Sequence, residues 1–121
     1  MTTLGANVRC VAGASHREAI ATLYTEVFGA KALRPQPDLD VYALGGSAHV
    51  GVYFVPDDEA LTPGQQEAVG TWIELCVEDV AATQAELERR GFAPLTYHDQ
   101  AHAYFQAPGG QVFRLAALAP G

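Results

Sequence analysis

The chain has 121 residues, of which 49% are hydrophobic and 17% are charged, so it is globular rather than disordered. Its net charge of −7 and the scatter of its seven Lys and Arg residues argue against a nucleic-acid partner. It contains no long apolar run for a membrane span, no signal-peptide pattern, and too few cysteines for a disulfide framework. We therefore expect a cytoplasmic protein with reduced thiols and no membrane partner.

The first half of the chain predicts one strand, one helix and three more strands. Ser15 and Glu18 have the spacing of a capping box, which predicts a helix start. Apolar residues then recur at helical spacing as far as Phe28, and Gly29 is predicted to end the helix. Gly45-Gly46 is predicted to turn the chain before the last strand. The predicted strands are residues 7–11, 31–35, 40–44 and 48–55.

The second half predicts the same order of elements. The polar, proline-containing segment 56–70 is predicted to be a linker. Asp79 is a suitable N-cap for a helix over residues 80–90, which Gly91 would end. Pro108-Gly109-Gly110 is predicted to form the final turn. The predicted strands are residues 72–77, 92–98, 102–107 and 111–117.

Two short signatures recur at nearly the same offset, which indicates an internal repeat. Gly29-Ala30-Lys31-Ala32-Leu33 is echoed by Gly91-Phe92-Ala93-Pro94-Leu95, and Gly45-Gly46 by Gly109-Gly110. The sequence therefore predicts an α+β fold of two βαβββ modules, with curved mixed sheets around a cup. We expect a single domain over 1–121, divided into module one (6–55), the linker (56–70) and module two (71–118).

Several stretches resemble the vicinal oxygen chelate (VOC) superfamily, which includes glyoxalase I, extradiol dioxygenases, and fosfomycin- and bleomycin-resistance proteins. The matching stretches are residues 23–29, 72–80, 89–92 and 104–115. The resemblance implies the paired-module fold and a homodimer. In enzymes of this superfamily it also implies a divalent metal, held by His and Glu side chains from the first and fourth strands of each half.

The expected metal ligands are not retained in this sequence. The family spacing places Trp72 and Arg114 at the two ligand positions of the second half. In the first half it places Arg9 at the histidine position and falls near Val50 for the carboxylate. Guanidinium and indole groups carry no lone pair for a metal. We therefore expect no metal and no cofactor at the family site.

The candidate ligand-binding residues are those that strand alternation turns toward the predicted cup. They are Arg9, His49, Tyr53, Trp72, Glu74, His102, Tyr104, Gln106 and Arg114. Trp72 could stack on a ligand, or be a core or subunit-contact residue. Arg114 could form a structural ion pair with Glu74, or Arg114 or Arg9 could bind a polar group of a ligand.

These residues favour a metal-independent binding protein of the bleomycin-resistance type, which would sequester a small, partly aromatic antibiotic or toxin, uncharged or anionic. One alternative is a VOC lyase or dioxygenase with a non-standard metal site made by His49, His98, His102 and Asp99. Another is an enzyme that uses His49, His102 or Tyr104 as acid or base. A regulatory domain whose cup is filled by its own side chains is also open.

Overall fold

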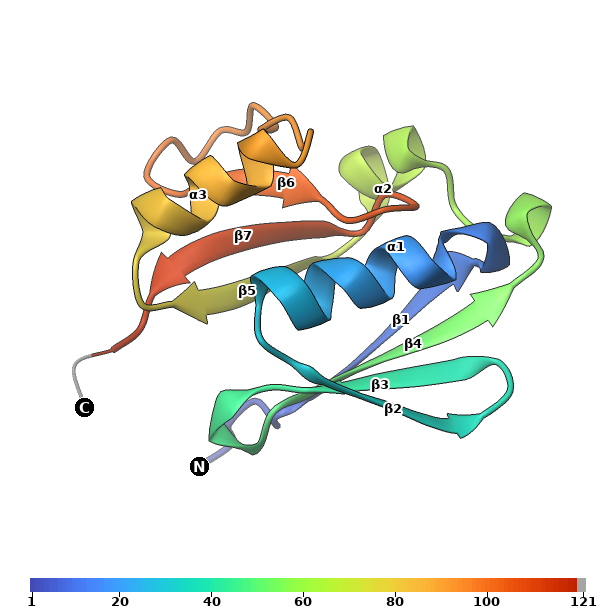
Figure 1. Ribbon diagram of the computed structural model, residues 1–121. Helices are drawn as coiled ribbons and strands as arrows, with labels where there is room; N and C mark the ends of the chain where they lie inside the picture. The colour runs from blue at the N-terminus through green and yellow to red at the C-terminus, as the bar shows by residue number, and fades with distance from the viewer. Residues whose placement is uncertain (120–121) are drawn as a thin grey trace. The chain divides into compact units, whose positions relative to one another are not determined.

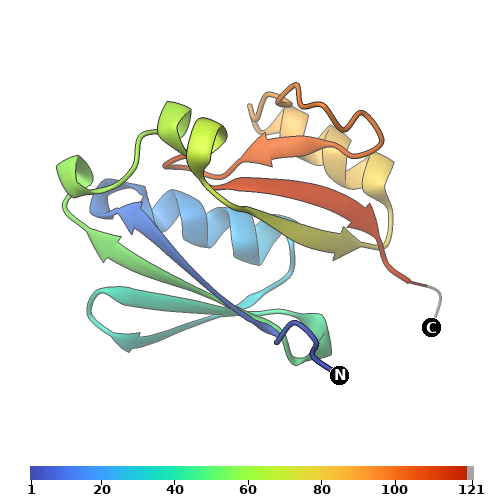
Figure 2. The same cartoon turned by 180° about the vertical axis from the view of Figure 1, so that it is seen from behind.

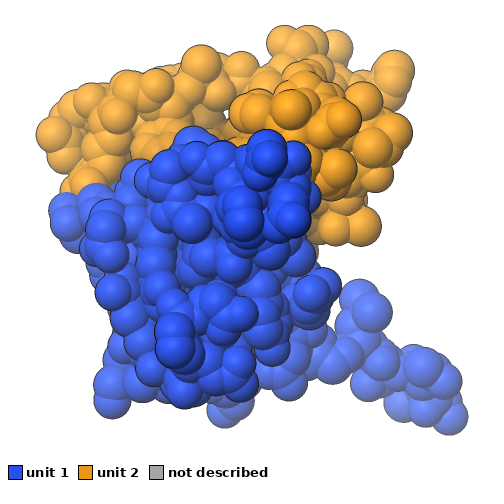
Figure 3. Space-filling model, turned by 90° about the vertical axis from the view of Figure 1, so that its right-hand side faces the viewer, with its two compact units in different colours: residues 1–60 blue, residues 61–121 orange. Residues whose placement is uncertain are grey.

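The computed structural model describes residues 1–119. The chain divides into two compact units, unit 1 from Met1 to Ala60 and unit 2 from Leu61 onward, which Figure 3 colours separately. Each unit contains a mixed sheet and a helix that packs on one of its faces (Figure 1). This confirms the α+β class that the sequence predicts.

Unit 1 has a four-stranded sheet in the order β1-β4-β3-β2. The strands are β1 (Asn7–Gly13), β2 (Lys31–Gln36), β3 (Leu39–Ala43) and β4 (His49–Val55). The first and last strands pair in parallel, and the other neighbours pair antiparallel, so the sheet is mixed as predicted. Side chains of β4 alternate strictly between buried and half-buried, because one face of the sheet lies under the helix.

The helical segment of unit 1 differs from the prediction at its start. A 3₁₀ turn (Ala14–His16) precedes α1 (Arg17–Thr22), and a π-helical turn (Leu23–Val27) follows it. The Ser15–Glu18 capping box was wrong, because no side chain caps this start. The Ser15 amide instead donates to Asp57 Oδ1 at 3.1 Å, and Glu18 accepts from Arg34 at 2.9 Å. The 3₁₀ turn changes the direction of the chain before the α-helix begins.

The core of unit 1 lies between this helix and the sheet. Ile20, Leu23 and Tyr24 are buried on the helix, as their spacing predicts. The Tyr24 ring stacks on Tyr42 of β3, with centroids 4.7 Å apart and planes 8° from parallel. This stack fixes the helix on the sheet by burying two large aromatic side chains.

Unit 2 has a three-stranded sheet in the order β5-β7-β6. The strands are β5 (Trp72–Val77), β6 (Tyr104–Gln106) and β7 (Val112–Ala117), and α3 spans Val80–Arg89. Asp79 caps α3 as predicted, since its carboxylate accepts from the Ala82 amide at 3.0 Å. Figure 2 shows α3 behind the strands, where Leu87 packs in the core with Ile73, Leu75, Phe105, Phe113 and Leu115.

The strand predicted over 92–98 does not form, and this is the main difference between the two units. Only a single bridge joins Leu95 to Tyr104. Pro94 lacks an amide hydrogen for a ladder, and the residues after Leu95 turn away from β6 into an irregular loop. The outer edge of β6 is therefore bordered by the loop of residues 91–103.

The predicted linker, 56–70, is more ordered than expected. It contains a 3₁₀ turn (Asp57–Glu59) and the helix α2 (Pro63–Val69). Thr62 and Gln65 form a reciprocal capping box, and Pro63 occupies the first helical position. This signature was present in the sequence but lacked the apolar periodicity of a core helix.

Candidate functional site

The open face of the unit 2 sheet, opposite α3, carries four of the candidate residues. Glu74 on β5 pairs in register with Arg114 on β7, and Tyr104 on β6 pairs with Arg114 from the other side. Trp72 lies two residues before Glu74 and shares its face. Strand pairing therefore brings Trp72, Glu74, Tyr104 and Arg114 together from three separate strands.

Arg114 is engaged through all three of its side-chain nitrogens. Nε and Nη2 lie 2.8 Å and 2.6 Å from Glu74 Oε2. Nη1 donates to the Tyr104 hydroxyl at 3.1 Å and to Asp99 Oδ2 at 3.3 Å. Hydrogen bonds to Tyr104 and Glu74 raise the pKa of Arg114, so it remains cationic. The ion pair with Glu74 that the sequence suggested is present.

Asp99, in the loop after α3, connects this face to the edge of β6. Its Oδ2 accepts from His102 Nδ1 at 2.7 Å and from the Tyr104 hydroxyl at 2.9 Å, and its Oδ1 accepts from the Ala101 amide at 2.8 Å. The amide of Ala101, then His102 and Tyr104, lower the pKa of Asp99 to about 2. Sequence reasoning weighed Asp99 as part of a displaced metal site or as a residue of a polar turn, and the bond from the Ala101 amide is that of a turn.

Aromatic rings surround this polar cluster. The Arg114 guanidinium carbon lies 4.2 Å from the centroid of the Trp72 ring, and Trp72 meets Tyr104 edge-on with centroids 6.1 Å apart. Trp72 is 43% exposed, so it is not a core residue of unit 2. Tyr97, which sequence reasoning missed, lies 4.6 Å from Tyr104 between ring centroids.

A pocket of about 410 Å³ opens between α3 and the loop 94–103. Its apolar wall includes Val80, Leu95 and the two tyrosine rings, and its polar groups include Asp99 and His102. The full lining is Val80, Gln84, Pro94, Leu95, Thr96, Tyr97, Asp99, Gln100, Ala101, His102, Ala103 and Tyr104.

A second hollow, of about 640 Å³, lies between the end of α2 and the same loop. It is lined by Glu67, Ala68, Thr96, Tyr97, His98 and Gln100. Tyr97 therefore borders both pockets, and its hydroxyl donates to the Glu67 carbonyl at 3.1 Å. This bond ties the loop to α2 and fixes the wall between the two pockets.

The remaining candidate residues lie outside this cluster. Arg9, His49 and Tyr53 are on β1 and β4 of unit 1, on the face away from α1, and the Arg9 guanidinium lies 5.0 Å from the Tyr53 centroid. Gln106, on β6, uses its amide nitrogen to donate to the carbonyls of Pro63 and Gly110. Gln106 is therefore engaged in holding the α2 start and the β6–β7 turn.

Comparison with known protein families now identifies the class of this chain. A family model described as a glyoxalase-like domain matches residues 9–116. The chain belongs to the glyoxalase-like domain family. No match is found among curated protein sequences.

Solved structures of similar fold agree with this assignment. TnmS3, an antibiotic binding protein from Streptomyces sp. CB03234, has a TM-score of 0.65 and 20% identity, and the match covers 98% of this chain and 99% of TnmS3. A glyoxalase/bleomycin resistance protein from the same organism has a TM-score of 0.57 and 22% identity, covering 90% and 97% of the two chains. The fosfomycin resistance protein FosX from Listeria monocytogenes, solved with Mn(II) and sulfate, has a TM-score of 0.72 and 12% identity, covering 98% and 93%.

The donor set of this glyoxalase-like domain does not fit the metal that enzymes of the superfamily hold. Trp72 and Arg114 share one face, as two ligands would, but neither can donate a lone pair. In unit 1, Arg9 is cationic and cannot be a ligand. Val50 is buried on the helix side, and β4 contains no carboxylate that could replace it. Within residues 1–119, no three His, Cys, Asp or Glu side chains form a group that could hold an ion.

In the described part of the glyoxalase-like domain, no helix has the length and apolar character needed to cross a bilayer.

Proposed function

We propose that this protein binds a small, partly aromatic molecule in unit 2 without the help of a metal, and that it sequesters an antibiotic or toxin. The observation that carries the proposal is the pocket of about 410 Å³ between α3 and the loop 94–103, walled by Tyr97 and Tyr104. Its size is that of a small-molecule site, and its lining combines apolar side chains with several polar groups. TnmS3, with 20% identity over nearly the full length, is an antibiotic binding protein, which supports this class of function.

The chemistry at the family's metal-ligand positions supports the metal-independent part of the proposal. A divalent cation beside Arg114 would meet a fixed positive charge, and Trp72 would offer it only a ring. The Arg114–Glu74–Asp99 network holds β5, β7 and the loop together instead. Trp72, which is 43% exposed, presents aromatic surface on the open face of the unit 2 sheet.

A binding screen tests the proposal. We expect aromatic antibiotics, but not Mn²⁺, Zn²⁺, Ni²⁺ or Fe²⁺, to raise the melting temperature, because a ligand at about 100 times its Kd adds about 2.7 kcal/mol of stability. Bound ligand should also change the fluorescence of Trp72, the only tryptophan. Tyr97→Leu should weaken binding about tenfold, whereas Val69→Ala, at an exposed residue of α2 outside both pockets, should not.

Stoichiometric divalent metal in protein purified without chelator would contradict the metal-independent proposal. So would a ligand that binds equally well to wild type and to Tyr97→Leu, because it would have to occupy another site.

A second candidate function is a metal-free acid–base enzyme, and the Asp99–His102 contact favours it. His102 Nδ1 lies 2.7 Å from Asp99 Oδ2, and this contact leaves the other ring nitrogen, Nε2, as the candidate acid or base at the pocket wall. His102→Gln should then abolish turnover and leave ligand affinity nearly unchanged. If His102→Gln changes only the affinity, His102 is a binding residue.

We also propose a homodimer, which the family resemblance implies. Exposed apolar side chains remain at both ends of the unit 2 strands, Val69 and Trp72 near the start of β5 and Leu118 after the end of β7, and a second copy could cover either end.

A further inference from the structure

We infer that the pocket beside Asp99 selects an aromatic compound that carries a protonated amine. The inference rests on the proposed binding function and specifies the class of ligand. It differs from the sequence-based expectation of an uncharged or anionic molecule, in which Arg114 or Arg9 was one possible partner for a polar group of the ligand.

Arg114 is not available to an anionic ligand. Glu74 occupies Nε and Nη2, and Tyr104 and Asp99 occupy Nη1. A ligand carboxylate would have to displace a protein carboxylate from a bond of 2.6–2.8 Å. Arg114 also does not line the pocket, whereas its partner Asp99 does, so a ligand in the pocket would contact the carboxylate and not the guanidinium.

The charge that remains at the pocket is negative. One guanidinium faces two carboxylates, Glu74 and Asp99, which leaves one net negative charge when His102 is neutral. Asp99 is the only one of these three groups in the pocket wall. The other polar residues of this wall, among them Gln84 and Gln100, carry no charge. An anion placed there would meet like charge, and a cation would meet opposite charge.

The neutral groups of the wall also suit an ammonium ion. The half-buried ring of Tyr97 lines the pocket and can attract a cation through its quadrupole, whereas Tyr104 is only 4% exposed and offers little ring surface. Nδ1 of His102 faces Asp99, which leaves the other ring nitrogen, Nε2, for a hydrogen bond with a ligand. The apolar side chains of Val80, Pro94 and Leu95 would hold the aromatic part.

Three probes of matched size and different charge test the inference. They are tyramine (a cation at pH 7), tyrosol (neutral) and 4-hydroxyphenylacetate (an anion), titrated into the full chain and followed by amide chemical shifts of the pocket residues. We expect tyramine to bind about tenfold more tightly than tyrosol, and the anion to bind most weakly. Raising the salt from about 10 mM to about 150 mM should reduce the preference.

Asp99→Asn should remove the preference for tyramine over 4-hydroxyphenylacetate. Glu88→Gln, the same change of charge at an exposed position on α3 outside the pocket, should preserve it. The ranking of the three probes on wild type decides the question even if Asp99→Asn disturbs the loop.

The inference is overturned if 4-hydroxyphenylacetate binds as well as tyramine, or if Asp99→Asn and Glu88→Gln reduce the preference equally. The proposed function survives both results, because an aromatic molecule still binds the pocket. If tyramine fails to shift the pocket residues while a compound from the antibiotic screen does so, only the charge selectivity is wrong. If neither binds, both proposals fail.

Discussion

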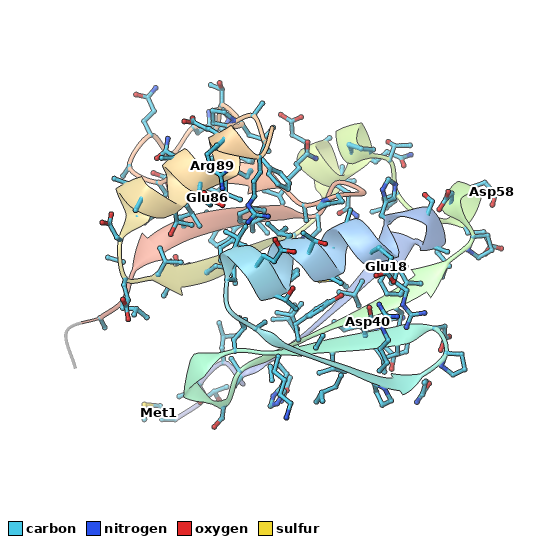
Figure 4. All side chains as sticks on the ribbon, in the orientation of Figure 1. Met1, Glu18, Asp40, Asp58, Glu86 and Arg89 are labelled. Carbon is cyan, nitrogen blue, oxygen red and sulfur yellow. The ribbon has the colours of Figure 1, made fainter. Side chains whose placement is uncertain are left out.

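At the scale of single residues, each unit has one carboxylate that binds three other side chains. Asp40, on β3, is fully buried and binds Arg17, Arg34 and the Tyr42 hydroxyl. Figure 4 shows it on the side of the sheet that faces α1, below Glu18. Asp99 of unit 2 is partly exposed and binds His102, Tyr104 and Arg114. The difference in burial makes Asp40 structural and leaves Asp99 accessible to a ligand.

Asp40→Asn should destabilise the protein by about 3 kcal/mol, because it leaves two guanidinium groups beside a buried neutral amide. Glu18→Gln is the matched control, since it removes only an exposed pair with Arg34 and should cost less than about 1 kcal/mol. Urea unfolding of both variants measures the difference. Equal costs would show that Asp40 does not hold the arginines in solution.

Asp99 should make stability depend on acidity in a defined window. Its pKa is lowered from 3.8 to about 2 in the folded protein, so its contribution is present above about pH 4 and is lost as the pH falls toward 2. The loss of unfolding free energy between pH 5 and pH 3 should therefore be smaller in Asp99→Asn than in wild type. If wild type and Asp99→Asn lose the same unfolding free energy between pH 5 and pH 3, the lowered pKa of Asp99 is wrong.

At the scale of elements, the loop between α3 and β6 sets unit 2 apart from unit 1. Because residues 92–98 form one bridge rather than a strand, the loop leaves a pocket against α3 instead of closing the sheet. The position of α3 therefore matters to the pocket, to which it contributes Val80 and Gln84.

Asp79→Ala should destabilise the start of α3 by about 1 kcal/mol, since the carboxylate caps the Ala82 amide. Glu78→Ala removes a neighbouring exposed carboxylate with no capping bond and should be close to neutral. Hydrogen exchange at the first turn of α3, together with urea unfolding, separates the two. Equal stability and equal hydrogen exchange in Asp79→Ala and Glu78→Ala would show that the Asp79 cap does not stabilise α3.

At the scale of the whole molecule, each unit buries its own core between a sheet and a helix, and each leaves the other face of its sheet with polar and aromatic side chains. Small units of this kind gain stability by covering additional apolar surface. Association of two copies, which the family resemblance implies, would cover such surface.

Sedimentation equilibrium should give a mass about twice the 12.8 kDa of one chain. Trp72→Ala and Leu118→Ala, at two exposed apolar positions of unit 2, should weaken the association if this surface is covered. Leu33→Ala, at an exposed apolar position of unit 1, is the comparison. A monomer at about 100 µM would contradict the dimer, because stable interfaces of ordinary size persist far below that concentration.

The sequence by itself determined the periodic elements and their faces. The alternation of Trp72 and Glu74 with Ile73 and Leu75 predicted which side of β5 would be buried, and Asp79 and Gly91 marked the ends of α3. Such signals are local, because burial on one face imposes a period on neighbouring residues. The ion pair of Glu74 with Arg114 was suggested because alternation turned both side chains to the same face and an inward arginine needs a partner.

Only the tertiary structure decided the site. Asp99 reaches Arg114 from an irregular loop that has no periodicity, and Tyr97 meets Tyr104 because that loop packs beside β6 without forming a ladder with it. The sequence suggested Glu74 as a partner of Arg114 and left ligand binding as an alternative, and only the folded arrangement of three strands and a loop shows that Tyr104 and Asp99 also bind it. The charge of the pocket depends on which of these groups neutralise one another, and that is set by distances between residues far apart in the chain.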